Sequence, residues 1–186
     1  MKKVYIVNIL PLLNQEVYQY YYDRIGTCRQ QKADKLVSYL DKARSVGAGA
    51  VLRFAVEDAT GCNYDELSLR VGKNGKPYIE GAPFYFSLAH SGDYAVCAIS
   101  DSPVGVDIEQ DRELSEAFKA RFSHSILEWT KKEAKGKLTG KGFFDDSPME
   151  CYVFTHHKSD GYIITVCSDE SFDDLLYYHL PFPTLS

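Results

Sequence analysis

The stretch YAVCAISDSPVGVDIEQ, residues Tyr94–Gln110, lies in the middle of the chain and carries its most regular pattern. Hydrophobic residues run through both of its ends, and each end has the length and composition of a buried β-strand. The polar segment Asp101–Pro103 separates the two runs. The pattern therefore predicts two strands, and we expect them to pair as a hairpin.

Helical and strand patterns lie on both sides of this stretch. Residues 40–61 carry apolar side chains at helical spacing, and Gly47 and Gly49 within them indicate close packing or a ligand against the helix. The other elements expected before the central stretch are an N-terminal strand, a helix over 16–25, and strands around 67–71 and 84–88. Those expected after it are helices over 113–122 and 125–138, a hairpin of 150–157 with 161–168, and a strand over 174–180.

Each half of the chain therefore consists of helices followed by a sheet. This order predicts an α+β fold with two similar helix-plus-antiparallel-sheet halves and a cleft between them. We place the halves at residues 1–101 and 102–186. No segment rich in Pro, Gly or Ser separates them, so we expect a single compact unit and a monomer.

The composition sets limits on the class of protein. The chain has 186 residues, of which 45% are hydrophobic, and this is enough for a substantial core. The formal net charge of −5 disfavours binding to nucleic acid or to an anionic membrane. The five cysteines are scattered and lack C-x-x-C spacing, which argues against a disulfide framework or a zinc site. A reducing, cytoplasmic environment is the prediction that follows.

The N-terminus resembles a short signal peptide, because two lysines precede an apolar stretch. However, Asn8 interrupts that stretch, and the alternation of Val4, Ile6 and Asn8 is typical of a strand. No apolar run in the sequence reaches the roughly 20 residues that a membrane-spanning helix requires. We therefore predict a first strand rather than a targeting or membrane segment.

Two carboxylates stand inside the apolar run VGVDIEQ. Residues two apart on a strand point to the same side, so Asp107 and Glu109 would present their carboxylates together while Ile108 faces the core. Paired carboxylates suit a hard cation such as Mg²⁺. Taken alone, this spacing is also common on the solvated face of an ordinary strand.

A second group of polar residues lies on the helix predicted over 125–138. Trp129, Glu133 and Lys137 are spaced four residues apart and therefore share one face. A Glu–Lys pair at this spacing is often only a surface ion pair. A third carboxylate next to a metal pair, with a lysine one turn further on, also fits a site that handles a pyrophosphate.

A histidine and several scattered cations complete the candidate residues. His90 ends a predicted strand and is followed by the turn sequence Ser91–Asp93, which would hold the imidazole at the edge of the sheet. Cations that could gather on one ligand lie upstream, although each alone is most often a solvated charge. They are Arg29, Lys32, Arg44, Arg53 and Lys76.

Together, the motifs GKP, FSLAHSGDYAVCAI, VGVDIE and WTKKEAKGKLTGKG, in this order, resemble those of the 4'-phosphopantetheinyl transferases, and most closely the surfactin-synthetase-activating type. The resemblance runs from about Arg29 to Gly142 and more weakly through Gly161–Ser168. It implies the fold of that family, in which a pseudo-twofold axis relates the two halves, and an enzyme of the transferase class.

Enzymes of this family transfer the phosphopantetheine arm of coenzyme A to a serine of an acyl or peptidyl carrier protein and release 3',5'-ADP. The resemblance implies that Asp107, Glu109 and Glu133 ligate Mg²⁺. It further implies that Glu133 deprotonates the carrier serine, that Lys137 holds the phosphate under attack, and that His90 contacts the phosphates of coenzyme A.

The same resemblance implies a coenzyme A site in the first half of the chain. Arg44 and Ser45 match the position that meets the ribose 3'-phosphate. Lys76 and Pro77 match a dipeptide that lies against the adenine. The basic residues expected to assist are Arg29 and Lys32.

The chain departs from the family pattern at three places. Ser87 and Ala89 stand where Asn and Ser are usual, and the segment between Phe122 and Trp129 is shorter than usual. These departures support an alternative to an active transferase. In this alternative, the protein is a module that binds coenzyme A or a carrier protein and has reduced or lost turnover. A magnesium-dependent pyrophosphate hydrolase is a further alternative, but no separate motif supports it.

Overall fold

The computed structural model describes residues 1–142, 151–171 and 176–180 of the chain, and their α+β architecture confirms the predicted fold class. The first half contains β1 (Lys2–Asn8), α1 (Gln15–Tyr22), α2 (Thr27–Asp34), α3 (Tyr39–Thr60), β2 (Leu69–Val71), β3 (Pro77–Ile79), β4 (Tyr85–Ser91) and β5 (Tyr94–Ser100), with short 3₁₀ helices at Leu10–Leu13 and Tyr64–Glu66. The second half contains β6 (Val104–Gln110), α4 (Glu116–Arg121), α5 (Ile126–Thr139), β7 (Tyr152–Lys158), β8 (Tyr162–Ser168) and β9 (Leu176–Leu180).

The first sheet has the strand order β4-β5-β1-β9. β1 lies inside it, antiparallel to β5 and parallel to β9. Because both faces of β1 are covered, its side chains are buried in both directions: Tyr5 and Val7 belong to the core under the helices, and Val4 and Ile6 to the core between the two sheets. The predicted N-terminal strand is therefore confirmed, with burial on two faces.

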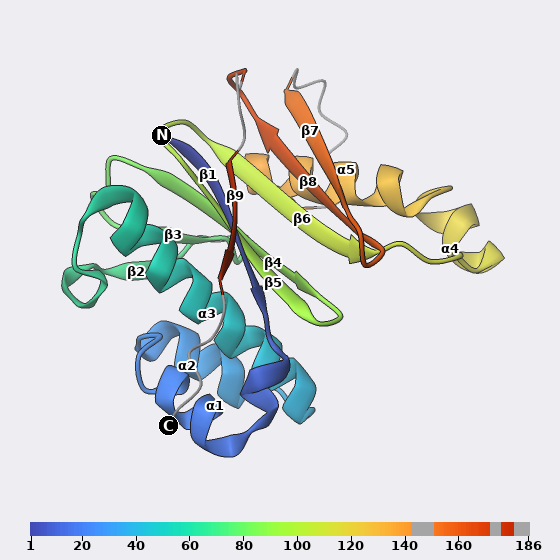
Figure 1. Ribbon diagram of the computed structural model, residues 1–186. Coiled ribbons are helices and arrows are strands. Elements are labelled where there is room, and N and C mark those ends of the chain that lie inside the picture. The colour runs from blue at the N-terminus through green and yellow to red at the C-terminus, as the bar shows by residue number, and fades with distance from the viewer. Residues whose placement is uncertain (143–150, 172–175, 181–186) are drawn as a thin grey trace.

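The long helix α3 packs across the first sheet, with α1 and α2 beside it (Figure 1). Its N-terminus is capped by the hydroxyl of Ser38, and it ends at Gly61 in the left-handed conformation. A Cβ atom at Gly47 would lie 2.5 Å from Ile9 Cγ2, and one at Gly49 would lie 2.7 Å from Ile25 Cβ. The two glycines therefore permit close packing rather than contact with a ligand.

The predicted hairpin between β5 and β6 is wrong. β5 has β4 on one edge and β1 on the other, so it has no free edge for β6. β6 instead leaves the first sheet and pairs antiparallel with β8 in a second sheet of order β6-β8-β7. It still passes beside β4, where the Val106 amide donates a hydrogen bond to the Ser87 hydroxyl at 3.0 Å.

The second sheet contains the predicted hairpin of β7 and β8, which is confirmed. One face of this second sheet packs against the first sheet, and α5 covers the other face along β6 and β8 (Figure 1). The last strand, β9, joins the first sheet although it comes from the end of the chain. The division into halves at residues 101 and 102 and their pseudo-twofold relation stay predictions.

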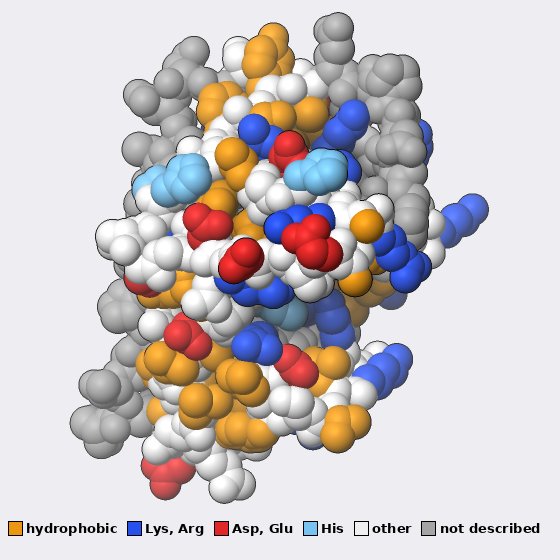
Figure 2. Space-filling model, turned by 90° about the vertical axis from the view of Figure 1, so that its right-hand side faces the viewer, with side chains coloured by type: hydrophobic (Ala, Val, Ile, Leu, Met, Phe, Trp, Pro, Cys, Tyr) orange, Lys and Arg blue, Asp and Glu red, His pale blue; other side chains and the backbone are white. Residues whose placement is uncertain are grey.

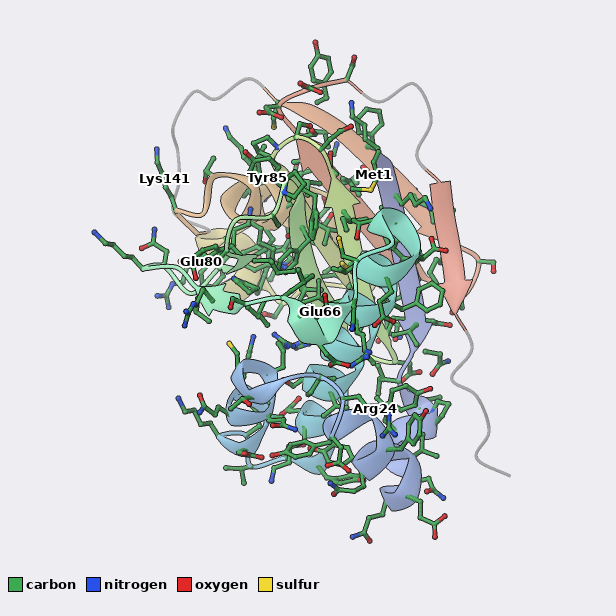
Figure 3. All side chains as sticks on the ribbon, turned by 90° about the vertical axis from the view of Figure 1, so that its left-hand side faces the viewer. Met1, Arg24, Glu66, Glu80, Tyr85 and Lys141 are labelled. Atoms are coloured by element: carbon green, nitrogen blue, oxygen red, sulfur yellow. The ribbon has the colours of Figure 1, made fainter. Side chains whose placement is uncertain are left out.

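The β2–β3 hairpin bridges the two halves. Asn74 Nδ2 donates to the carbonyl of Gly140 at 2.7 Å, and Lys76 Nζ donates to the carbonyls of Val104 and Leu138 at 3.1 and 3.4 Å. Figure 3 faces this junction, with Glu80 on the hairpin and Lys141 just after α5. The hairpin therefore holds the end of α5 against the first half. No helix within the described ranges is long and apolar enough to cross a bilayer.

Gly105 sets the distance between α5 and β6. A Cβ atom there would overlap the carbonyl oxygen of Ala134 and lie 2.5 Å from the amide nitrogen of Leu138, and both are backbone atoms of α5. We expect Gly105→Ala to lower the free energy of unfolding by about 3 kcal/mol, measured by urea denaturation, because the helix must move to admit the methyl group.

Gly72→Ala is the matched control for this substitution. A Cβ atom at Gly72 would have its nearest neighbour, the Lys76 carbonyl oxygen, at an ordinary 3.4 Å. We expect this variant to change the free energy of unfolding by less than about 0.5 kcal/mol. A Gly105→Ala protein as stable as the Gly72→Ala protein would contradict the close approach of helix and strand.

Candidate active site

Strand β6 presents the two predicted carboxylates on the face that α5 covers. Asp107 is 5% exposed and Glu109 is half-buried, while Ile108 between them is fully buried in the core between the sheets. The expected alternation along this strand is therefore confirmed. It places the carboxylates of Asp107 and Glu109 side by side at the inner edge of the second half.

Helix α5 is seated so that its polar face meets these carboxylates. The Ser125 hydroxyl caps its N-terminus, and Gly140 ends it in the left-handed conformation. Its buried side faces the sheet, where the hydroxyls of Thr130 and Thr165 lie 2.8 Å apart. With that side fixed, Glu133 and Lys137 are half-buried on the flank of the helix that adjoins β6.

Lys137 forms an ion pair with Asp107. The distance from Lys137 Nζ to Asp107 Oδ1 is 2.7 Å. Burial is the main effect that raises the pKa of Asp107 to about 6; Lys137 acts in the opposite direction, and the charges of Glu109 and Glu133 raise this pKa further. The second oxygen, Asp107 Oδ2, is buried without a hydrogen-bond partner among the described residues.

The three predicted metal ligands thus lie close enough to influence one another's charge. However, in the part of the chain that the structure describes, no three His, Cys, Asp or Glu side chains are close enough together to ligate one ion. The ammonium group of Lys137 is instead the cation beside Asp107. The structure therefore brings Asp107, Glu109 and Glu133 to one site without assembling them into a ligand set.

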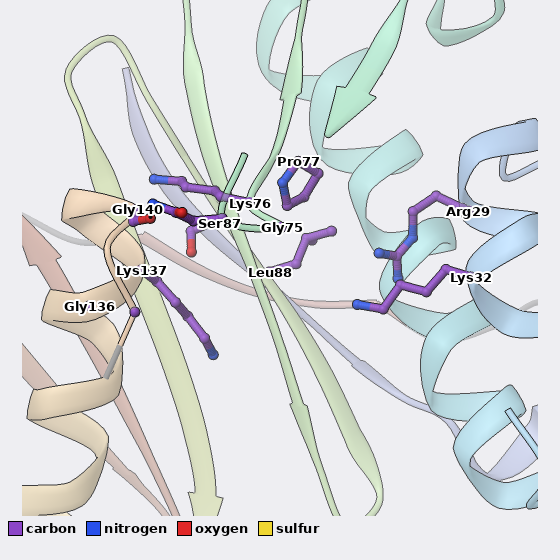
Figure 4. A pocket seen from close by; sticks show the side chains of 12 residues that line it. Arg29, Lys32, Gly75, Lys76, Pro77, Ser87, Leu88, Gly136, Lys137 and Gly140 are labelled. Carbon is purple, nitrogen blue, oxygen red and sulfur yellow. Dashed lines mark hydrogen bonds between the residues drawn. The ribbon is translucent and has the colours of Figure 1, made fainter. Parts of the chain in front are cut away.

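A cavity of about 210 Å³ lies beside these residues, between the first half and α5 (Figure 4). Figure 4 shows Arg29 and Lys32 entering from one side, Lys137 from the other, and Pro77 and Leu88 between them. Five of the residues predicted from the sequence line this cavity: Arg29, Lys32, Lys76, Pro77 and Lys137. Figure 2 shows Lys and Arg side chains inside a hollow on this side of the molecule.

Arg29 is the deepest of the cations. It is 3% exposed and donates from Nη2 to the carbonyl oxygen of Ser45 at 2.9 Å, while its Nε has no partner within the described ranges. Burial lowers the pKa of Arg29. Ser45 itself is fully buried, so it supports Arg29 through its carbonyl instead of presenting its hydroxyl to the cavity.

His90 lies in an electropositive environment. Crowding by protein atoms, followed by the charges of Lys32, Lys137, Arg29 and Arg44, lowers the pKa of His90 to about 4. Although neighbouring protein atoms crowd the ring, His90 as a whole residue is exposed to solvent. At neutral pH the imidazole is therefore uncharged because of its lowered pKa, and an anion bound beside the ring would favour its protonated form.

Lys32 and Arg44 complete the basic wall. Crowding by protein atoms and then the charges of Arg29 and Lys137 lower the pKa of Lys32, although the residue stays exposed to solvent. Arg44 donates from Nε to the Gly92 carbonyl at 2.8 Å and pairs with Asp41 at 2.8 Å, so it borders the turn that follows His90. Cations this close repel one another, and a polyanionic ligand would relieve that repulsion.

Lys76 stabilises the junction between the two halves. Its ammonium group is bound to backbone carbonyls, one of them in the last turn of α5, where the helix dipole favours a positive charge. Burial lowers the pKa of Lys76 to about 8. Pro77 next to it lines both the cavity and an adjoining apolar groove that contains Tyr78 and Phe86.

Some motif residues lie away from the cavity. Trp129 packs edge-on against Phe118 and Phe122, and Lys132 donates to the Phe122 carbonyl at 2.7 Å. Both residues therefore join α5 to α4. Ala89 is buried in the core between the sheets, so the missing hydroxyl at this position removes no side chain from the cavity wall.

Sequence reasoning missed several residues of the site. Asn74, Ser87 and Gly136 line the cavity, and Ser91 donates to Glu109 Oε2 at 2.7 Å. No periodicity singles out such small or polar residues. Their position next to the GKP, HSG and WTKKEA motifs was the available signal.

The fold and this arrangement define a class of protein. It is an α+β protein in which cations from both halves line one cavity, as suits a ligand with several phosphate groups, and one of these cations, Lys137, pairs with the Asp107 carboxylate.

Comparison with known proteins identifies the class further. No protein-family model matches the chain. The chain is similar to the 4'-phosphopantetheinyl transferase psf-1 of Bacillus pumilus, with 25% identity covering 75% of this chain and 77% of the relative. It is also similar to the transferase gsp of Aneurinibacillus migulanus, at 23% identity over 93% and 83% of the two chains, and to Sfp of Bacillus subtilis strain 168, at 22% over 89% and 92%.

These relatives confirm the resemblance to the 4'-phosphopantetheinyl transferases of the Sfp type. They support a general 4'-phosphopantetheinyl transferase activity and mark the chain as an enzyme of the transferase class.

The pKa of His90 provides a test of the electropositive environment around its ring. Binding of 3',5'-ADP should raise this pKa from about 4 by roughly 1–3 pH units, because the added phosphates favour the imidazolium. The measurement is the pH titration of the His90 ring resonance by NMR, with exposed His124 as the control. An unchanged His90 midpoint at saturating 3',5'-ADP would contradict phosphate binding beside this ring.

The same lowered pKa predicts how stability depends on pH. In the ligand-free protein, His90 resists protonation, so folding stability should fall as the pH drops from about 6.5, the ordinary histidine value, towards 4. In urea denaturation, His90→Gln should show a weaker loss over this interval. The same dependence of stability on pH in both proteins would contradict the lowered pKa of His90.

Proposed function

We propose that the protein transfers the 4'-phosphopantetheine arm of coenzyme A to a serine of an acyl or peptidyl carrier protein, with Mg²⁺ as cofactor, and releases 3',5'-ADP. One observation carries the proposal. Arg29, Lys32 and Lys137 line one cavity, and together with Arg44 they lie close enough to the uncharged His90 to lower its pKa. Coenzyme A has a pyrophosphate and a 3'-phosphate, and its charge complements this wall.

The first half of the chain would bind and orient coenzyme A. Arg29, Lys32 and Arg44 would meet the phosphates, with His90 donating a hydrogen bond once an anion has raised its pKa. Pro77 and the groove beside it would take the adenine, since an apolar surface suits a flat ring. Binding at several separated groups fixes the pyrophosphate in place before the reaction begins.

The carboxylates at the site are of the chemical type that binds a magnesium ion, although within the described residues they are not grouped closely enough for three of them to ligate one ion. Asp107 Oδ2 is a buried carboxylate oxygen without a partner in the described part of the chain, and Asp107 is already paired with one cation, Lys137. Asp107, Glu109 and Glu133 supply the oxygen ligands that Mg²⁺ prefers. When bound, the ion would neutralise the charge of the pyrophosphate and of the departing phosphate.

Lys137 and Glu133 would act on the reacting groups. The ammonium group of Lys137 points into the cavity region and can stabilise charge on the phosphate under attack. Glu133 has no hydrogen bond or ion pair to another described residue, so it is free to accept the proton of the carrier serine. The serine oxygen then bonds to the phosphorus of the arm as the bond to 3',5'-ADP breaks.

We expect the carrier protein to approach from the side of α4 and α5. A single set of site residues shared between two halves is consistent with a monomer. A cytoplasmic location would supply both coenzyme A and the carrier.

The activity is tested by incubating the protein with coenzyme A, Mg²⁺ and a panel of apo carrier proteins, and measuring the added arm by mass spectrometry. We expect modification of at least one carrier and equimolar 3',5'-ADP. Binding of coenzyme A with no carrier modified would favour the binding module. Release of 3',5'-ADP with no carrier modified would indicate hydrolysis.

Substitution of the carboxylates tests their assigned roles. We expect Asp107→Asn and Glu133→Gln each to reduce the rate of transfer at least about 100-fold, because one loses a metal ligand and the other the base. EDTA should abolish transfer, and added Mg²⁺ should restore it. The control is Glu113→Gln, an exposed carboxylate after β6, which should leave the rate unchanged. Near-normal activity of either site variant would refute its role.

A further inference from the structure

We infer that Ser91 is a positioning residue that orients the Glu109 carboxylate for the metal ion, an inference that rests on the proposed magnesium-dependent function. Ser91 is the last residue of β4, and Glu109 lies near the end of β6. The Ser91 hydroxyl donates to Glu109 Oε2 at 2.7 Å, and both side chains are half-buried. This bond connects the two sheets directly at the predicted metal site.

The turn that carries Ser91 is held at several points. Gly92 has φ +52°, and a Cβ atom there would overlap the Tyr162 hydroxyl of β8. The Asp93 amide donates to Tyr162 Oη at 3.1 Å, and Arg44 Nε donates to the Gly92 carbonyl at 2.8 Å. Because Tyr162 is only 5% exposed, it is a fixed support. The Ser91 hydroxyl is therefore presented from a rigid turn.

The two β6 carboxylates are oriented in a similar way. Asp107 is held through Oδ1 by Lys137, and Glu109 is held through Oε2 by Ser91. Each carboxylate therefore has one oxygen engaged and one left for a ligand; Asp107 Oδ2 and Glu109 Oε1 have no hydrogen bond to any described residue. Residues that hold metal ligands in this manner commonly contribute 10–100-fold to metal affinity.

The chemical nature of the two partners differs. Lys137 brings a positive charge to Asp107, whereas the Ser91 hydroxyl is neutral and leaves the negative charge of Glu109 uncompensated. A neutral donor can fix the direction of a carboxylate while reducing its attraction for a cation less than a positively charged partner would. Ser91 therefore orients Glu109 without neutralising its charge.

The test measures metal binding in the absence of the carrier protein. Mn²⁺ serves as the probe and is followed by electron paramagnetic resonance, with the full-length protein saturated with coenzyme A. We expect Ser91→Ala to weaken Mn²⁺ binding about tenfold, and Ser91→Thr, which keeps the hydroxyl, to bind within about threefold of the wild type. Coenzyme A binding measured in EDTA should be equal in all three proteins.

A double-mutant cycle separates orientation of Glu109 from a general structural effect. If Ser91 acts through Glu109, adding Ser91→Ala to Glu109→Gln should weaken Mn²⁺ binding no further. Additive losses would overturn the inference. So would Mn²⁺ binding by Ser91→Ala equal to that of the wild type, or a tenfold loss of coenzyme A binding in EDTA, which would assign Ser91 to the phosphates.

The result for the wild type separates failure of the proposed magnesium-dependent function from failure of the role of Ser91. Wild-type protein that binds no Mn²⁺ in the presence of coenzyme A would overturn the magnesium-dependent function and the role of Ser91 together. Wild-type protein that binds Mn²⁺ while Ser91→Ala binds it equally well would overturn the role of Ser91 alone.

Discussion

The seating of α5 on β6 is the contact on which the candidate site depends. Gly105 has no side chain, so the helix backbone at Ala134 and Leu138 can lie directly against the strand. This close approach fixes the height of the helix above the sheet and brings Lys137 to Asp107. Glu133, one turn earlier, then faces the same carboxylates. A larger side chain at one position of β6 would displace all of these groups.

The site lies where two sets of charges meet. The first half contributes most of the cations, and the second half contributes Lys137 and the three carboxylates. Polar contacts from the β2–β3 hairpin and the Ser91–Asp93 turn hold the two halves together. Arg29 Nε and Asp107 Oδ2 are buried without partners in the described residues. Such groups cost stability in the free protein, and they are expected where a ligand supplies the missing interactions.

Local patterns predicted the elements that carry the chemistry. Alternation along β6 correctly assigned Asp107 and Glu109 to one face and Ile108 to the core, and helical spacing placed Glu133 and Lys137 on one flank of α5. The pairing of β5 with β6 was predicted wrongly, because a short turn between two strands indicates a hairpin only when an edge is free. Here β1, from the other end of the sequence, already occupies that edge of β5.

The sequence by itself therefore determined the periodicity of each element, the helix caps, and the identity of nearly all the charged groups at the site. Tertiary structure decided which strands pair, that Arg29 is buried while Lys32 stays accessible, and that Lys137 and Ser91 each hold one oxygen of a β6 carboxylate. The physical reason is the range of the interactions. Caps and periodicity act within a few residues, whereas sheet edges and hydrogen bonds between the halves depend on segments that meet only in the folded chain.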